Sequence, residues 1–201
     1  MSRLRSCLLF LLAATGSVCA QQSSQADRSR GIVRVVIETE RGNITVALDS
    51  AHAPISVANF LRYVDRGLYD GGRFHRSVTP ANQPNDTVRI EVIQAGADTA
   101  RRAEGLGPIE LERTSVTGLR HHDGTLSMAR AGPNTATSDF FICIGDQPAL
   151  DFGGHRNLDG QGFAAFGHVT DGMSVVRAIQ ASPVQAQRLT PPVKIKSIRR
   201  L

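Results

Sequence analysis

Residues 124–145, GTLSMARAGPNTATSDFFICIG, constrain the fold of this chain more than any other segment. Leu126 and Met128 alternate with small or polar residues, which is typical of a strand that is buried on one face. A stretch rich in Gly, Pro and Asn follows and favours a tight turn. The apolar run at 140–144 then predicts a second, buried strand. A polar loop between two anchored strands leaves backbone groups accessible, which suits a site that binds an extended peptide.

Strand-like segments recur along the rest of the chain and predict a mainly β fold. Apolar residues at 32–37 and 44–48 flank Arg41-Gly42-Asn43, the signature of a hairpin turn. Further segments of this kind lie between Gly-rich and Pro-rich connections, at 72–78, 88–95, 124–130, 138–145, 163–169 and 193–198. Nineteen Gly, nine Pro and an aromatic content of 5% also favour a turn-rich β architecture over a helical bundle.

Two segments have the periodicity of helices. Pro54 opens the first, Ser56 is placed to cap it, and Gly67 ends it. The second covers residues 173–181 and is ended by Pro183. A chain of 201 residues is one domain by size. We therefore predict a closed eight-stranded antiparallel β-barrel capped by two α-helices, because closure leaves no sheet edge exposed.

Residues 1–20 have the features of a secretory signal peptide. Arg3 and Arg5 precede an apolar run at 7–14, and small residues at 18–20 form a cleavage site. The run is too short to span a bilayer, which needs about 20 residues. Arg3 and Arg5 also account for two of the five net positive charges. The other arginines are scattered without interleaved aromatic residues, so we do not expect nucleic-acid binding.

Cleavage after residue 20 predicts an exported, periplasmic protein, which we expect to be a monomer. A lipid anchor through Cys19 is the alternative, and it is disfavoured because Val18 stands where such a signal needs a smaller residue. Residues 21–30 are polar and predict a flexible leader before a folded domain at 31–201. Only Cys143 remains after cleavage, so no intramolecular disulfide is expected.

Three motifs resemble the cyclophilins, a family of β-barrel peptidyl-prolyl isomerases. They are Phe74-His75-Arg76 with Ile93-Gln94-Ala95-Gly96 downstream, SMARAGPNTATSDFFI at 127–142, and Phe163-Ala164-Ala165-Phe166-Gly167. The motifs occur in family order between residues 32 and 181. Together with the export signal, the resemblance implies a bacterial, exported isomerase whose partners are proline-containing polypeptides.

The implied reaction is rotation about an X-Pro bond, which meets a barrier of about 18–20 kcal/mol because the nitrogen shares its lone pair with the carbonyl. No covalent bond breaks, so neither a cofactor nor a metal ion is needed. The reaction needs an apolar slot for the proline ring and donors that fit the twisted amide better than the planar one. The guanidinium of Arg76 suits the donor role because it stays charged and presents its N–H groups in a rigid fork.

The resemblance implies roles for ten residues. Arg76 aligns with the catalytic arginine, and Gln94 with the glutamine that positions the substrate and the arginine. The implied substrate-binding residues are Phe141 and Leu150 in the proline pocket, Phe163 where many members have His or Tyr, Val92, Asp139, and the segment of Ala129, Arg130 and Ala131, in which Arg130 acts through its main chain.

The chain departs from the family pattern in an insertion at 77–90. Glu91 and Val92 consequently stand where the family has Phe-Met. Without that Phe, the proline pocket loses part of its apolar lining. Either Val78 or Ile90 then fills the gap, or the affinity for the substrate falls.

Charged residues near the motifs raise two further hypotheses. Asp139 replaces a glutamine of the family, and we expect it to pair with Arg76 and moderate its charge. His121 and His122 beside Asp123 hint at a metal site, but no HExxH or CxxC accompanies them. We therefore expect these histidines to lie in a solvated loop.

Two classes of function follow. The first is an isomerase that assists the folding of exported proteins. The second is a catalytically weak peptide-binding module or chaperone, which Glu91 and Asp139 motivate. Ser127 and Ser138 lack the GxSxG context of a serine hydrolase. A barrel that binds a small apolar ligand would need an interior cavity, which the large core residues should fill.

Overall fold

The computed structural model describes residues 31–201, so the predicted signal peptide and leader lie outside the described part of the chain. The strands are β1 Ile32–Thr39, β2 Gly42–Asp49, β3 Arg73–Val78, β4 Val92–Gly96, β5 Thr125–Met128, β6 Phe140–Cys143, β7 Ala164–Asp171, β8 Val184–Gln185 and β9 Arg188–Arg200. The helices are α2 Pro54–Asp65, α3 Thr114–Thr117 and α4 Met173–Gln180, with 3-10 turns η1 Pro80–Asn82, η2 Thr99–Glu104 and η3 Pro148–Leu150.

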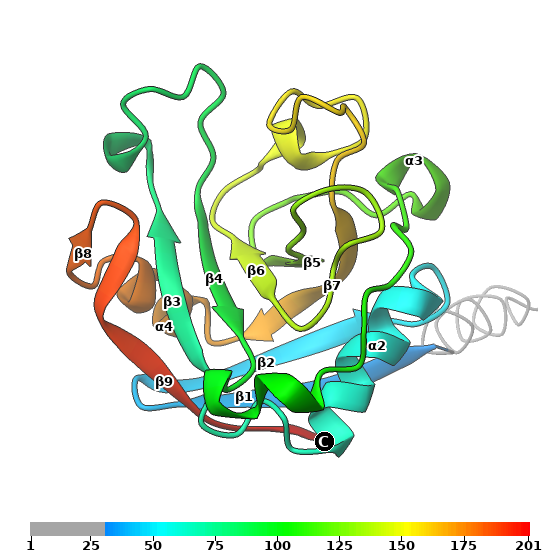
Figure 1. Cartoon of the computed structure of the whole chain (residues 1–201), viewed down its shortest axis with the longest axis vertical. Coiled ribbons are helices and arrows are strands. Elements are labelled where there is room, and N and C mark those ends of the chain that lie inside the picture. Colours follow the sequence, from blue (N-terminus) through cyan, green and yellow to red (C-terminus); the bar gives the residue numbers. More distant parts are fainter. Residues whose placement is uncertain (1–30) are drawn as a thin grey trace, which may run out of the picture. The chain divides into compact units, whose positions relative to one another are not determined.

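Eight of these strands close into a barrel (Figure 1). The sheet order is β1-β2-β7-β5-β6-β4-β3-β9-β8, and β1 also pairs with β9. All pairs are antiparallel, and the two-residue β8 pairs only with β9, outside the closed ring. The predicted closed eight-stranded barrel is confirmed. The two long helices are those predicted, and α3 adds a single turn that is too short to show a helical period.

Glu112, and not Ser56, caps the first turn of α2. Its carboxylate accepts hydrogen bonds from the amides of Ile55 at 2.9 Å and Ser56 at 2.7 Å. A carboxylate at a helix N-terminus satisfies free amides and faces the positive end of the helix dipole. The predicted cap was wrong because a residue far along the chain occupies these amides, and the hydroxyl of Ser56 has no hydrogen-bond partner within residues 31–201.

Alternation along β6 separates two apolar clusters. Phe140 and Ile142 point into the barrel and join the main core together with apolar side chains of α2 and α4. Phe141 and Cys143 point to the outer face. There they belong to a smaller cluster, the outer cluster, whose buried members are Val78, Ile90, Val92, Phe141, Cys143, Leu150 and Phe163.

A bulge in β3 redirects the side chain of Arg76. Phe74 pairs with Ala95 and Arg76 pairs with Gln94, so one extra residue, His75, is inserted in β3. Phe74 is fully buried in the main core. In a regular strand, a side chain two residues later would point to the same face. The bulge instead brings Arg76 to the outer face of the barrel.

Candidate active site

Four residues from four neighbouring strands form a row across the outer face. Arg76 of β3 lies opposite Gln94 of β4, and Gln94 lies opposite Phe141 of β6. Ser127 of β5 continues the row on the other side of Phe141. Side chains at directly opposed positions of neighbouring strands lie on the same face, close enough to interact. Strand register therefore brings together motifs that are far apart in the sequence.

A pocket of about 450 Å³ opens over Arg76, Gln94 and Phe141 of this row. All ten residues singled out in the sequence line it: Arg76, Val92, Gln94, Ala129, Arg130, Ala131, Asp139, Phe141, Leu150 and Phe163. Five further residues line the pocket. Ile90 was one of two candidates to fill the slot, Thr135 and Thr137 lie within the motif at 127–142 without an assigned role, and Arg156 and Asn157 were not indicated by the sequence. The pocket has an apolar wall from the outer cluster and a polar wall that contains Arg76.

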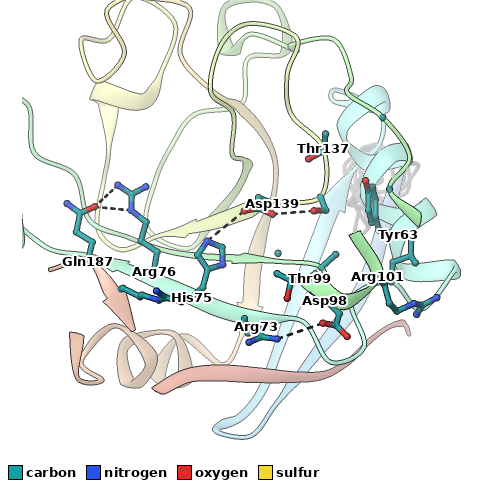
Figure 2. Close-up of a pocket in the computed structure, with 17 residues that line it drawn as sticks. Tyr63, Arg73, His75, Arg76, Asp98, Thr99, Arg101, Thr137, Asp139 and Gln187 are labelled. Carbon is teal, nitrogen blue, oxygen red and sulfur yellow. Dashed lines mark hydrogen bonds and ion pairs between the residues drawn. The ribbon is translucent and has the colours of Figure 1, made fainter. Parts of the chain in front are cut away.

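Neutral amides hold the guanidinium of Arg76, and Figure 2 shows the amide of Gln187. Its Nε and Nη2 groups donate to Oε1 of Gln187 at 2.9 and 2.6 Å, and Nη1 donates to Oε1 of Gln94 at 3.1 Å. Burial, followed by the nearby charge of Arg156, lowers the pKa of Arg76. Because the ordinary value is 12.5, the side chain still carries its positive charge at neutral pH.

The sequence did not indicate Gln187 as a partner of Arg76, because the position of Gln187 depends on tertiary contacts. Its carbonyl accepts a hydrogen bond from the amide of Ser77 in β3 at 2.9 Å. Its side-chain Nε2 donates to the carbonyl of Asn82 at 3.2 Å, which leaves Oε1 to face Arg76. No local motif could have revealed this arrangement, because Gln187 lies in the turn between β8 and β9.

Asp139 does not pair with Arg76, contrary to the prediction. Its Oδ2 accepts a hydrogen bond from Nε2 of Gln94 at 3.3 Å and lies 3.7 Å from Nε2 of His75. Gln94 therefore lies between the two charges, accepting from Arg76 and donating to Asp139. The intervening glutamine leaves the charge of Arg76 without a direct counterion from Asp139.

Ile90 lines the slot where the sequence departs from the family pattern. It is 5% exposed and lies beside Val92, with the fully buried Val78 in the same cluster. Glu91 turns away, and its carboxylate accepts from Nε2 of Gln180 in α4 at 3.0 Å. The insertion thus contributes an apolar side chain to the pocket.

The insertion is held in place from within, which is why β4 begins later than predicted. The side chain of Gln83 is almost fully buried. Its Nε2 donates to the carbonyls of Thr79 and Ile90 at 2.8 and 2.7 Å, and its Oε1 accepts from the amide of Ile90 at 3.2 Å. Because these bonds occupy the backbone of Ile90, the residue stays in the loop and the strand starts at Val92.

Arg130 is held by its side chain, while its backbone borders the pocket. Nη1 and Nη2 bind the carboxylate of Asp159 at 2.7 and 2.9 Å, and Nε donates to the carbonyl of Gly162 at 2.7 Å. The amide of Ala129 donates to the carbonyl of Asp139 at 2.9 Å.

The amide of Ala131 is also engaged within the protein. It donates to the hydroxyl of Thr135 at 3.1 Å. Two of the three amides in the predicted backbone-binding segment therefore have partners within the protein, and the described residues provide no partner for the amide of Arg130.

A second pocket, of about 810 Å³, shares Arg76, Thr137 and Asp139 with the first. Figure 2 shows its lining. Arg73 lies on its wall with Nη2 3.8 Å from Oδ1 of Asp98. An extended ligand that crosses the shared wall would reach both pockets.

His121 does not lie in a solvated loop, although its neighbour does. The side chain of His121 is fully buried, whereas that of His122 is 69% exposed. Both nitrogens of the His121 ring are hydrogen-bonded, to Asp151 and Ser127. The prediction was correct only for His122, because the fold brings Asp151 and the β5 residue Ser127 to the two ring nitrogens of His121.

Among residues 31–201 no three His, Cys, Asp or Glu side chains are grouped to hold a metal ion. Nor does any helix in this range have the length and apolar character to cross a membrane.

A family model described as cyclophilin type peptidyl-prolyl cis-trans isomerase/CLD matches residues 34–200. The chain belongs to this family. Peptidyl-prolyl cis-trans isomerase A of Dickeya dadantii is 37% identical over 164 residues, which cover 81% of this chain and 78% of the relative. Peptidyl-prolyl cis-trans isomerase cyp18 of Streptomyces antibioticus is 35% identical over 167 residues, covering 82% and 93%.

Solved cyclophilin structures share the fold of this isomerase. The crystal structure of a Cryptosporidium parvum cyclophilin in the presence of the dipeptide Ala-Pro superposes with a TM-score of 0.66 and 25% identity. The match covers 84% of this chain and 98% of the other.

Proposed function

We propose that this isomerase accelerates X-Pro bond rotation with Arg76 as the catalytic residue. The observation that carries the proposal is a charged guanidinium, held by neutral amides, at the edge of an apolar slot. A guanidinium has five N–H groups, and three of those of Arg76 are engaged, so two remain for a ligand.

The proline ring of the substrate would lie against the apolar wall, where Phe141, Leu150 and Phe163 are almost fully buried. The free N–H groups of Arg76 would then face the prolyl nitrogen. That nitrogen regains its lone pair as the amide twists, so a positive donor stabilises the twisted state more than the planar one. Gln94 would hold the guanidinium and the substrate in register.

The peptide backbone would be bound by the main chain of Arg130, since the amides of Ala129 and Ala131 are engaged within the protein. Residues next to the proline would reach the second pocket across Thr137 and Asp139. This arrangement suits a proline-containing polypeptide. The Cryptosporidium structure was solved in the presence of Ala-Pro, a dipeptide that contains proline.

A protease-coupled or NMR-exchange assay on proline peptides tests the activity. The wild-type protein should accelerate isomerisation, and Arg76→Ala should remove most of the acceleration. No acceleration by the wild type, or full activity of Arg76→Ala, would contradict the proposal. Suppression of aggregation by such an inactive protein would instead support a peptide-binding module.

We further propose that the protein works outside the cytoplasm of a bacterium on exported polypeptides. The support is the arginine-flanked apolar run at 7–14 followed by small residues at 18–20. N-terminal analysis of protein recovered from the periplasm should find Gln21 as the first residue. An acylated Cys19 would indicate a lipid anchor, and an intact Met1 would contradict export.

A further inference from the structure

His121 forms a buried hydrogen-bonded chain with Asp151 and Ser127. Its Nδ1 lies 2.8 Å from Oδ1 of Asp151, and its Nε2 lies 2.9 Å from Oγ of Ser127. Burial acts to raise the pKa of Asp151, but hydrogen bonds from His121 and Arg120 outweigh it, so the pKa is lowered. An ionised Asp151 only accepts hydrogen bonds, so Nδ1 of His121 carries a proton.

The order Ser–His–Asp matches that of a hydrolase triad, but the site has no access for a substrate. Ser127 and His121 are 0% and 1% exposed, and neither residue lines either of the two pockets described above. A nucleophilic serine must reach a carbonyl carbon and have an oxyanion site beside it. The chain of hydrogen bonds is therefore not a second catalytic site. Its role follows from the residues that pack against it.

The imidazole of His121 packs against the floor of the proline pocket. Its ring is stacked on Phe141 with centroids 6.0 Å apart and planes at 17°. Phe163 meets Phe141 edge-on at 5.4 Å, and the guanidinium of Arg130 lies over Phe163 at 5.1 Å. Phe141 is thus held between His121 beneath it and Phe163 beside it.

The hydrogen bonds of His121 also tie together the elements that carry the pocket. Ser127 lies in β5 directly opposite Phe141 of β6. Asp151 follows Leu150 at the end of η3, and its carboxylate accepts from both the ring and the backbone amide of His121. Only an imidazole offers two polar nitrogens at its edge and a flat face for an aromatic neighbour.

We propose that His121 is a positioning residue for the isomerase reaction, which holds Phe141 and Leu150 in the geometry that accepts a proline ring. This inference rests on the proposed function of the pocket. It concerns a residue that touches no substrate and acts through the two side chains that do.

The test compares two substitutions at adjacent positions in the full-length protein. His121→Asn keeps a donor for Asp151 but removes the ring and the contact with Ser127. His122→Asn makes the same change at an exposed position that lines neither of the two pockets, and it serves as the matched control.

The split between KM and kcat distinguishes positioning from general destabilisation. Pocket contacts act on bound substrate before and during rotation, so His121→Asn should raise KM about fivefold and change kcat less than about twofold. Partial unfolding would lower kcat and leave KM unchanged, because it only removes active protein. The aromatic NMR signals of Phe141 should shift in His121→Asn and stay in place in His122→Asn.

Ser127→Ala is a second variant in case His121→Asn does not fold. It removes one hydrogen bond from the ring, and we expect KM to rise about twofold with shifted Phe141 signals. Wild-type KM and unchanged Phe141 signals in every folded variant would overturn the inference. If the wild-type protein itself has no isomerase activity, the proposed function fails. If the wild-type protein is active and substitution of His121 leaves its KM unchanged, only the inference about His121 fails.

Discussion

Arg76 and Arg130 line the same pocket, but they differ in what holds them. The guanidinium of Arg76 donates only to the neutral amide oxygens of Gln187 and Gln94. Arg130 binds both carboxylate oxygens of Asp159, and its side chain is 1% exposed. Neutral partners orient a cation without cancelling its charge, whereas a bidentate carboxylate does both.

This difference shows that the hydrogen-bond partner of an arginine determines whether the charge of its guanidinium is available to a ligand. Among the ion pairs of residues 31–201, Arg130 appears and Arg76 does not. The hydrogen bonds from Arg130 lower the pKa of Asp159 to about 2, which shows how closely the two charges are paired. Arg130 thus stabilises the loop around Asp159, whereas the positive charge of Arg76 remains available to the substrate.

The largest expected effect separates the two arginines directly. Arg76→Ala should lower kcat/KM by about 100- to 1000-fold, the range seen when a donor to a developing charge is removed. Arg130→Ala should lower it less than about tenfold, because its main chain stays in place and the losses are the bonds to Asp159 and Gly162 and the packing on Phe163. Steady-state kinetics on one proline peptide, with melting curves for both variants, measures the contrast. Equal losses of kcat/KM in the two variants would contradict the different roles assigned to the two arginines.

A sharper test gives Arg76 the kind of partner that Arg130 has. Gln187→Glu should form an ion pair with Arg76 and lower kcat/KM about tenfold, since about 1.4 kcal/mol of transition-state stabilisation is lost. Gln185→Glu adds the same charge at an exposed position of β8 and should leave the activity almost unchanged. An unaffected Gln187→Glu would show that the charge of Arg76 is not what matters.

Release of Arg130 from its carboxylate should have a smaller effect. Asp159→Asn leaves an amide that accepts only one strong hydrogen bond, so the wall of the pocket loosens and KM should rise about two- to threefold. The value of kcat should stay close to that of the wild type. A gain in kcat would mean that a freed Arg130 can reach the prolyl nitrogen, contrary to the assigned roles.

The smallest effect concerns pH. The pKa of Asp159 in the folded protein lies near 2, below its usual 3.8, so the stabilisation by this pair is complete above pH 3.8 and is lost as the pH falls through about 2. The NMR signal of the Arg130 Nε–H group should therefore be constant from pH 7 to 4. A transition of this signal centred near pH 4 would show that the pair is weaker than its geometry indicates.

Ten of the fifteen pocket-lining residues could be predicted from the sequence, because they match positions of the cyclophilin family. Local patterns also indicated the eight strands of the barrel, since alternation and turn residues act over a few positions, but they placed the start of β4 too early and did not indicate the two-residue β8. Phe140 and Phe141 illustrate the limit of this approach. Both lie in one apolar run, and only the register of β6 shows that the first enters the core and the second forms the floor of the pocket.

Three of the errors involve partners far apart in the chain, whereas the late start of β4 involves Gln83 and Ile90, which are close in sequence. Glu112 caps α2 in place of Ser56, and Gln94 separates Asp139 from Arg76. His121 was expected to lie in a solvated loop with His122, because the local sequence does not indicate a buried acceptor such as Asp151. Each of these contacts forms only after strands and loops have closed around it.

The sequence by itself indicated the barrel and the order of its strands along the chain, because hydrophobic period and turn chemistry are local properties, and its resemblance to the cyclophilins indicated ten of the residues around the pocket. Tertiary structure decided which face Arg76 takes, through the bulge at His75, and which neutral partner keeps its charge available, through Gln187. The physical reason is that hydrogen-bond partners and side-chain direction depend on strand register, and register is settled only when the barrel closes.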